Sequence, residues 1–197
     1  MQPSRSLSTR ELARIAVFAA LIAVLGLPGE LLLVGNAVPV TLQTLGVMLA
    51  GSLLGPRLGT LAVLTFLALV AAGLPLLAGG RGGLGVFVGP SAGYLVGFLA
   101  GAFVIGLIVA QGGRRYRPAL GLLANVVGGM LVVYAIGIPV QALVTGTSSL
   151  LATAYAAAVY LPGDAIKAVV ATAVATGVHR AYPQLTDRRS LRTTPGP

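Results

Sequence analysis

The chain has 197 residues, of which 56% are hydrophobic and 9% are charged, and its mean hydropathy is +0.95. Soluble domains carry roughly 25% charged residues, so this composition excludes a water-soluble globular protein. The lack of cysteine excludes a disulfide framework and a thiolate metal site. The net charge of +9 comes from short basic clusters between apolar runs, which indicates membrane topology and not binding to nucleic acid.

Long stretches without charge predict an all-α integral membrane bundle in the lipid bilayer. One helix needs about 20 apolar residues to cross a bilayer, and residues 58–80, 82–113 and 118–163 are free of charge. With Gly and Pro as boundaries, six transmembrane helices are predicted, near residues 11–27, 41–55, 58–74, 90–110, 118–141 and 162–182. They form a single domain over residues 1–183, and the polar segment 184–197 is predicted to be a disordered cytoplasmic tail.

The distribution of basic residues sets the orientation. Of the 13 lysines and arginines, all but Arg81 and Lys167 fall on one side of the predicted membrane. The positive-inside rule therefore predicts that both termini are cytoplasmic. The helices near 41–55, 90–110 and 162–182 then begin on the external side, where their unpaired N–H groups favour an anionic or acceptor group.

The first predicted helix contains two pairs of small residues spaced by four, Ala16/Ala20 and Ala19/Ala23. Small residues at this spacing let another helix approach closely. The pairs suit packing within the bundle, or a docking face for another membrane subunit.

The second predicted helix opens with polar residues, Thr41, Gln43 and Thr44, after Pro39. A threonine at this position suits an N-cap. A cap does not need an amide two residues inside a span, so Gln43 is a candidate for ligand binding.

Glycines surround Arg81 in the predicted external loop that joins the third and fourth helices. The loop is either mobile or tightly folded. Its arginine either faces water and lipid headgroups, or forms part of a lid that grips a carboxylate.

Gly89-Pro90-Ser91 opens the fourth predicted helix, and from there glycine recurs at every fourth position: Gly89, Gly93, Gly97 and Gly101. This pattern favours close approach of another helix backbone. Tyr94 suits either the interfacial aromatic belt or the wall of a pocket.

Asp164 and Lys167 open the last predicted helix after Pro162-Gly163. Asp164 suits an N-cap, and the lysine suits a side chain that reaches to the membrane surface. A charge at the centre of a span costs about 2.5–3.5 kcal/mol, and residues three apart share a helix face. Ionisable groups at membrane depth are candidates for function, so this pair is predicted to bracket a polar ligand.

Two absences narrow the function. The chain contains no GxxxxGK[ST] motif and so does not hydrolyse ATP through a P-loop. Its single histidine, His179, lies at the predicted cytoplasmic end, far from the external motifs. The sequence therefore predicts neither a serine–histidine catalytic site nor a histidine metal site, and no catalytic residue, metal or cofactor.

Four segments carry a resemblance to a known family: VPVTLQTLGVMLAG at 38–51, GLPLLAGGRGGL at 73–84, GPSAGYLVGF at 89–98 and PGDAIKA at 162–168. In this order they resemble the BioY family, the biotin-specific substrate-binding (S) subunits of energy-coupling factor (ECF) transporters. The resemblance covers roughly residues 11–182. The family more often shows GPTGGY where this chain has GPSAGY, and Ser91 keeps the hydroxyl.

The resemblance implies a six-helix plasma-membrane S subunit, not an enzyme, that captures biotin from outside for ATP-driven uptake. Its partners would be a transmembrane coupling protein, on which the alanine face of the first helix docks, and two cytoplasmic ATPases. A self-contained secondary transporter or channel is the alternative, and would call for inverted repeats and interrupted helices. A membrane-embedded enzyme or assembly factor would need a nucleophile and a base inside the bundle.

Biotin has a ureido ring with two N–H donors and a carbonyl, an apolar bicycle and a valerate carboxylate. Asp164 can accept from the ureido N–H groups, while Asn36, Gln43 or Thr44 can serve the ureido carbonyl. Tyr94 can cover the ring, beside Thr41 and Ser91 at the helix starts. Either Arg81 or Lys167 can pair with the carboxylate, and the sequence leaves both open.

Overall fold

The computed structural model describes residues 7–27, 38, 41–113 and 115–182. The predicted tail 184–197 and the candidate Asn36 lie outside these residues. In the described part, the regular structure is helical, and the only β pairing is an isolated bridge between Leu77 and Arg81. The predicted all-α class is confirmed.

Helix α1 (Thr9–Val24) begins with a capping box, in which Ser8 and Glu11 bond each other's backbone N–H groups. It buries Ile15, Ala19 and Ile22, which recur at helical spacing on the face toward the bundle.

Helix α2 (Gln43–Ala71) contains a sharp turn at Gly55, whose φ of 77° and ψ of −176° are not helical. A methyl group at Gly59 would come within 2.7 Å of the carbonyl oxygen of Ala50, so the second half folds back beside the first. The predicted spans 41–55 and 58–74 correspond to these two halves. Only glycine adopts this positive φ readily, and Pro56 then starts the second half.

Helix α3 (Ala92–Ala110) packs along a continuous helical stretch formed by α4 (Pro118–Val126), the π-helix η2 (Val127–Val132) and α5 (Val133–Val144). The predicted glycine ladder lies in this contact. A methyl group at Gly93, Gly97 or Gly101 would come within 2.5–3.0 Å of this stretch. Gly89 precedes α3, and a methyl group there would have only local neighbours, at 3.8 Å.

The C-terminal third contains a further helical segment before the last predicted span. The segment between the last two predicted spans forms α6 (Leu150–Ala157) and the 3-10 turn η3 (Ala158–Tyr160), and these lead directly into α7 (Leu161–Ala181). The predicted span 162–182 corresponds to α7, and α6 and η3 extend this helical stretch on its N-terminal side. Proline is tolerated here because it occupies the first turn of α7, where its missing N–H leaves no bond unmade.

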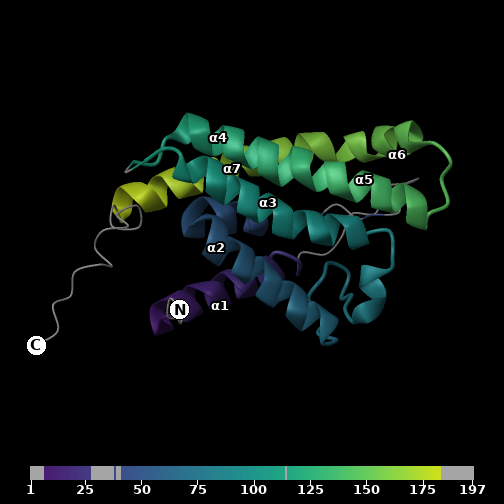
Figure 1. The fold of residues 1–197 in the computed structure, drawn as a ribbon, viewed down its shortest axis with the longest axis horizontal. Helices are drawn as coiled ribbons and strands as arrows, with labels where there is room; N and C mark the ends of the chain where they lie inside the picture. The colour runs from purple at the N-terminus through teal and green to yellow at the C-terminus, as the bar shows by residue number, and fades with distance from the viewer. Residues whose placement is uncertain (1–6, 28–37, 39–40, 114, 183–197) are drawn as a thin grey trace, which may run out of the picture.

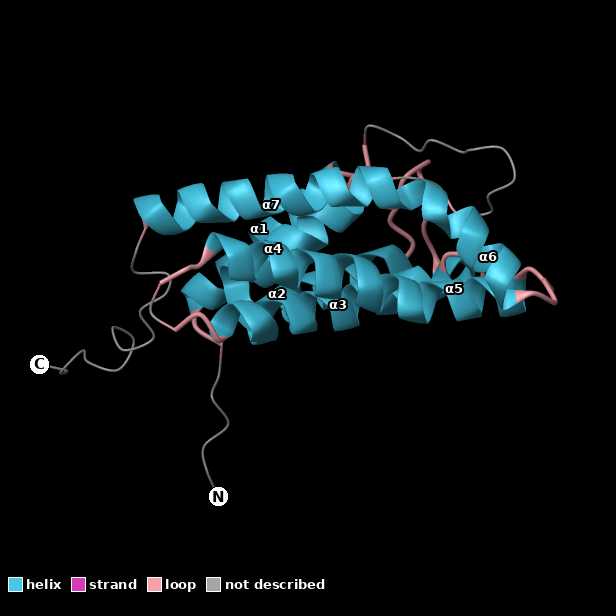
Figure 2. Cartoon of the chain, turned by 90° about the horizontal axis from the view of Figure 1, so that it is seen from above, coloured by secondary structure: helices cyan, strands magenta, loops and turns pink. Residues whose placement is uncertain are grey.

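Four segments in the described part are long and apolar enough to cross a membrane: Gln43–Ala71, Ala92–Ala110, Pro118–Val144 and Leu150–Ala181. Most helices run lengthwise along the elongated bundle (Figures 1 and 2). α1 begins at the same end as the Gly55 turn, the α3–α4 connection and the end of α7, and we call this the arginine end (Figure 1). It carries Arg10, Arg14, Arg57, Arg115, Arg117 and Arg180.

At the opposite end lie α6, the 72–91 segment, which begins with the turn after α2 and includes the 3-10 helix η1 (Leu84–Phe87), and the beginnings of α2, α3 and α7 (Figure 1). We call this the pocket end. The two ends differ in charge as the positive-inside rule requires of a membrane protein whose arginine end is cytoplasmic.

This orientation can be tested directly, because the chain has no native cysteine. Gln111 and Ser148 are exposed connection residues at the arginine end and the pocket end, respectively. A membrane-impermeant maleimide should label Ser148→Cys in intact cells, and should label Gln111→Cys only after the membrane is opened. The reverse pattern would invert the topology.

Candidate functional site

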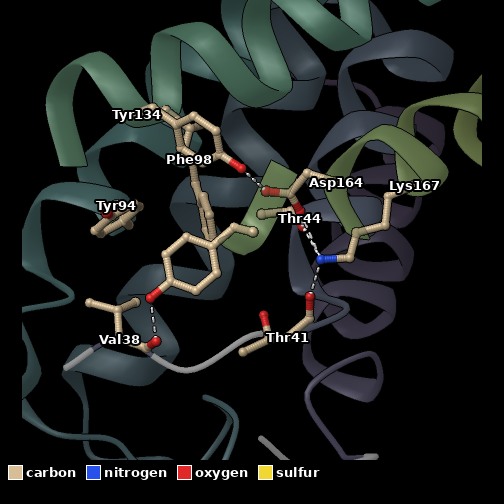
Figure 3. A pocket seen from close by; sticks show the side chains of 10 residues that line it. Val38, Thr41, Thr44, Tyr94, Phe98, Tyr134, Asp164 and Lys167 are labelled. Carbon is tan, nitrogen blue, oxygen red and sulfur yellow. Dashed lines mark hydrogen bonds and ion pairs between the residues drawn. The ribbon is translucent and has the colours of Figure 1, made fainter. Parts of the chain in front are cut away.

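A cavity opens at the pocket end, where α2, α3 and α7 begin. It is lined by Val38, Thr41, Thr44, Tyr94, Phe98, Val133, Tyr134, Tyr160, Asp164 and Lys167. Figure 3 shows the polar side chains of Asp164 and Lys167 facing Tyr94 across this cavity.

The charged side chains of the cavity form a buried ion pair on α7. Lys167 Nζ lies 2.8 Å from Asp164 Oδ1, and the two residues are 7% and 4% exposed. Lys167 also donates to the carbonyl oxygen of Thr41 and to Thr44 Oγ1 (3.1 Å). These three bonds match the three donors of an ammonium group, so the protein itself satisfies the lysine.

Asp164 collects hydrogen bonds from three different helices. Thr44 of α2 donates to Oδ1 (3.2 Å), Lys167 of α7 donates to the same oxygen, and Tyr134 of α5 donates to Oδ2. Figure 3 shows Tyr134 and Lys167 converging on this carboxylate. Hydrogen bonds from three sides fix the orientation of this carboxylate.

Aromatic side chains make the apolar wall of the cavity. The rings of Tyr94 and Tyr160 meet edge to face, with centroids 6.4 Å apart and planes at 84°. Tyr94 Oη donates to Gln141 Oε1 (2.7 Å), and Tyr160 Oη donates to the carbonyl oxygen of Val38. Because both hydroxyls donate to acceptors of the protein, the rings are held in place and present an apolar surface that suits a flat or bicyclic ligand.

A second chamber adjoins the first, and shares Val38, Thr41, Tyr94 and Phe98 with it. Its remaining lining is Gln43, Leu77, Arg81, Ser91 and Leu95. The guanidinium of Arg81 donates through Nε to Ala78 O (3.1 Å) and through Nη1 to Ser91 Oγ (3.3 Å). These bonds hold a cation at the opposite side of the shared aromatic wall from Asp164.

Gln43 fixes the loop that carries this arginine. Its amide nitrogen donates to Ile22 O (3.4 Å) and Leu76 O (3.0 Å), and its oxygen accepts from the N–H of Ala78 (3.3 Å). Ala78 is fully buried, and a bond between Leu77 N and Arg81 O closes the tight turn. The 74–84 loop is therefore tightly folded, which was one of the two alternatives left by its glycines.

Sequence reasoning named most of the polar residues that the fold brings together here. Thr41, Thr44, Tyr94, Asp164 and Lys167 line the first chamber, and Thr41, Gln43, Arg81, Ser91 and Tyr94 line the second. Thr41 also accepts from the N–H of Gln43 (3.2 Å), but the N-cap position of α2 is Leu42, so the alternative of a threonine N-cap is wrong.

The lining residues that sequence reasoning missed are mostly aromatic: Phe98, Tyr134 and Tyr160, with Val38 and Val133. A tyrosine inside an apolar run was an available signal, because a buried phenol needs a hydrogen-bond partner. The identity of that partner depended on which helices pack together.

The two alanine pairs of α1 face in different directions. Ala16 and Ala20 are exposed, whereas Ala19 is buried in the bundle and Ala23 packs against the same core. Only the first pair is therefore presented to the surroundings of the bundle.

Known proteins resemble this chain over almost its whole length. A sequence model of the BioY family matches residues 1–184. The chain is 46% identical over 188 residues to "Biotin transporter BioY" of Rhizobium etli, which covers 92% of this chain and 100% of that protein. It is 47% identical over 185 residues to the protein of the same name from Rhodobacter capsulatus, with 88% and 95% covered.

A solved structure shares the fold. It is described as the crystal structure at 2.1 Å of the S-component for biotin from an ECF-type ABC transporter, and it matches with a TM-score of 0.83 at 31% identity. The match covers 89% of this chain and 95% of that one. The family match over almost the whole chain, together with relatives above 40% identity, shows that this protein belongs to the BioY family.

Proposed function

We propose that this chain is the biotin-binding membrane subunit, or S component, of an energy-coupling factor transporter. The observation that carries the proposal is the buried carboxylate of Asp164, held by three helices at the base of an aromatic cavity. Membership in the BioY family and the likeness to a biotin S-component support the same ligand. The chain is thus a transport subunit and not an enzyme.

The chemistry of the first chamber suits the ureido end of biotin. Asp164 Oδ1 already accepts from Thr44 and Lys167, whereas Oδ2 accepts from Tyr134 and can take one further N–H donor from a ligand in the cavity. The Thr44 hydroxyl is beside this carboxylate and can turn to serve the ureido carbonyl. Tyr94 and Phe98 offer the apolar surface that the bicycle requires.

The second chamber suits the valerate carboxylate. Lys167 already donates three hydrogen bonds within the protein, to Thr41, Thr44 and Asp164, so its role is to hold the acceptor and not to bind the acid. Arg81 lies on the far side of the shared wall, and guanidinium groups bind carboxylates with two parallel bonds. We therefore assign the carboxylate to Arg81.

Transport requires partners, because the sequence carries no P-loop for ATP hydrolysis. We propose the partners of the family resemblance, a transmembrane coupling protein and two cytoplasmic ATPases. The exposed pair Ala16 and Ala20 on α1 is the proposed contact with the coupling protein, since small residues allow close helix approach.

The first prediction from this proposal concerns Asp164. Asp164→Asn keeps the shape of the side chain but replaces a charged acceptor by a neutral amide. Hydrogen bonds to charged groups are worth about 1.5–3 kcal/mol, so biotin affinity should fall roughly ten- to a hundredfold. Equilibrium binding to detergent-purified protein measures this.

Thr60→Val is the control for that experiment, because the Thr60 hydroxyl bonds only to Pro56 O in its own helix, next to the turn at the arginine end. Its affinity should equal that of the parent. If Asp164→Asn folds and binds biotin as tightly as the parent, Asp164 has a structural role and does not bind the ligand.

Arg81→Gln should separate the two ends of the ligand. Affinity for biotin should drop about tenfold or more, because a charge-assisted pair is lost, while affinity for the uncharged biotin amide should change less than about threefold. Binding of both ligands to the same preparation gives this ratio. Discrimination by Lys167→Met, with none by Arg81→Gln, would move the carboxylate to the lysine.

The docking face can be tested by contrasting the two alanine pairs. Ala16→Trp and Ala20→Trp should leave biotin binding intact but reduce co-purification with co-expressed coupling protein and ATPases. Ala19→Trp should instead lower the thermal stability of the isolated chain, because Ala19 is only 3% exposed and overpacking costs about 1–3 kcal/mol. Undiminished co-purification of both outward variants would refute the contact.

A further inference from the structure

A second group of buried polar side chains lies between the pocket and the arginine end. Ser52 Oγ donates to Asn125 Oδ1 (3.0 Å), and Asn125 Nδ2 donates to Thr172 Oγ1 (3.1 Å). Asn125 is 0% exposed and the other two are buried as well. We call these three residues the lower triad, and Thr44, Tyr134 and Asp164 the upper triad.

Both triads are built from the same three parts of the chain. Thr44 and Ser52 lie in the first half of α2, and Asp164 and Thr172 lie in α7. Each of these pairs is separated by eight residues, which is about 12 Å along an α-helix. Between the two levels lies an apolar layer that contains Met48, Met130, Ala168 and Ala171.

The third part of the chain is the α4–η2–α5 stretch, which carries Asn125 and Tyr134, and here the spacing is one residue longer. These two residues are nine apart. In a regular α-helix, the ninth residue would lie about 100° further around the axis than the eighth, so Tyr134 would point away from the seam. The π-helix η2 (Val127–Val132) lies between them, and a π turn takes up one residue more than an α turn. The π-helix η2 thus lets Asn125 and Tyr134 face the same side of the helix, toward α2 and α7.

The wide turn is also where this helix meets α2. A methyl group at Gly129 would come within 2.5 Å of Met48 Cε, and Met48 lies midway between Thr44 and Ser52. The side chains of α2 therefore fit the π turn at the level between the two triads. Rotation of this helical stretch would break the lower triad and this contact together.

We propose that the lower triad sets the rotation of the α4–η2–α5 stretch, and that Asn125 is a positioning residue for the ligand site, acting through Tyr134 on Asp164. The inference deepens the proposed function and rests on it for its ligand measurement. Asparagine suits this place because its amide accepts from α2 and donates to α7 at the same time.

The decisive variant is Asn125→Leu, which removes both bonds and keeps a similar volume. Thr172→Val removes one of them, and Thr176→Val is the matched control one turn along α7, where the hydroxyl bonds only to Thr172 O. Two measurements are made on each: biotin affinity, and the ring ¹³Cζ signal of Tyr134 in the ligand-free protein, assigned by its loss in Tyr134→Phe.

Asn125→Leu should weaken biotin binding about three- to thirtyfold and shift the Tyr134 signal, because the phenol no longer bonds to Asp164 in the same way. Thr172→Val should act in the same direction with a smaller effect, and Thr176→Val should change neither quantity. In a Tyr134→Phe background the effect of Asn125→Leu on affinity should fall below about twofold, whereas with Arg81→Gln the two effects should multiply.

The inference is overturned if the Tyr134 signal stays in place in both Asn125→Leu and Thr172→Val, or if Asn125→Leu weakens binding equally with and without the Tyr134 hydroxyl. Should Asn125→Leu fail to fold, Thr172→Val against Thr176→Val gives the same decision. If the parent chain binds no biotin but Asn125→Leu still shifts the Tyr134 signal relative to the parent, the positioning role is supported and the proposed function is refuted.

Discussion

The buried ion pair of Asp164 and Lys167 is the interaction on which the arrangement of the pocket depends. Removing one charge from water at membrane depth costs several kcal/mol unless its partner and its hydrogen bonds are supplied. The protein supplies them through Thr44 of α2, Tyr134 of α5 and the carbonyl oxygen of Thr41, which lies just before α2. The requirement to satisfy one pair therefore brings three helical segments together at the pocket end.

Close packing of backbones makes these contacts possible. Glycines of α3 meet the α4–α5 stretch at van der Waals distance, and Gly129 admits the side chain of Met48. In a membrane, where lipid is as apolar as leucine, such packing and interhelical hydrogen bonds replace the hydrophobic effect as the source of association. The two polar triads on one seam then fix the rotation of each helix, which apolar contacts alone leave loosely defined.

Much of the fold could be predicted from the sequence, because the bilayer permits few solutions. Charge-free runs predict helices, since backbone groups in hydrocarbon must bond within their own segment. The glycine ladder predicted a close helix contact, and Asp164 and Lys167 were candidate site residues because they are rare charged residues, three apart, at the start of a span. The Gly55-Pro56 turn was likewise visible, as a break between two spans.

Only the tertiary structure decided which side chains meet. Helical periodicity did not reveal that Tyr134 reaches Asp164, because a regular helix would turn it away and the π turn restores its direction. Nor did spacing show that Lys167 is saturated by Thr41 and Thr44, residues more than 120 positions away. The sequence determined which polar groups cost free energy when they are buried. The packing of helices distant in the chain determined their hydrogen-bond partners, because these partners depend on the rotation and register of one helix against another.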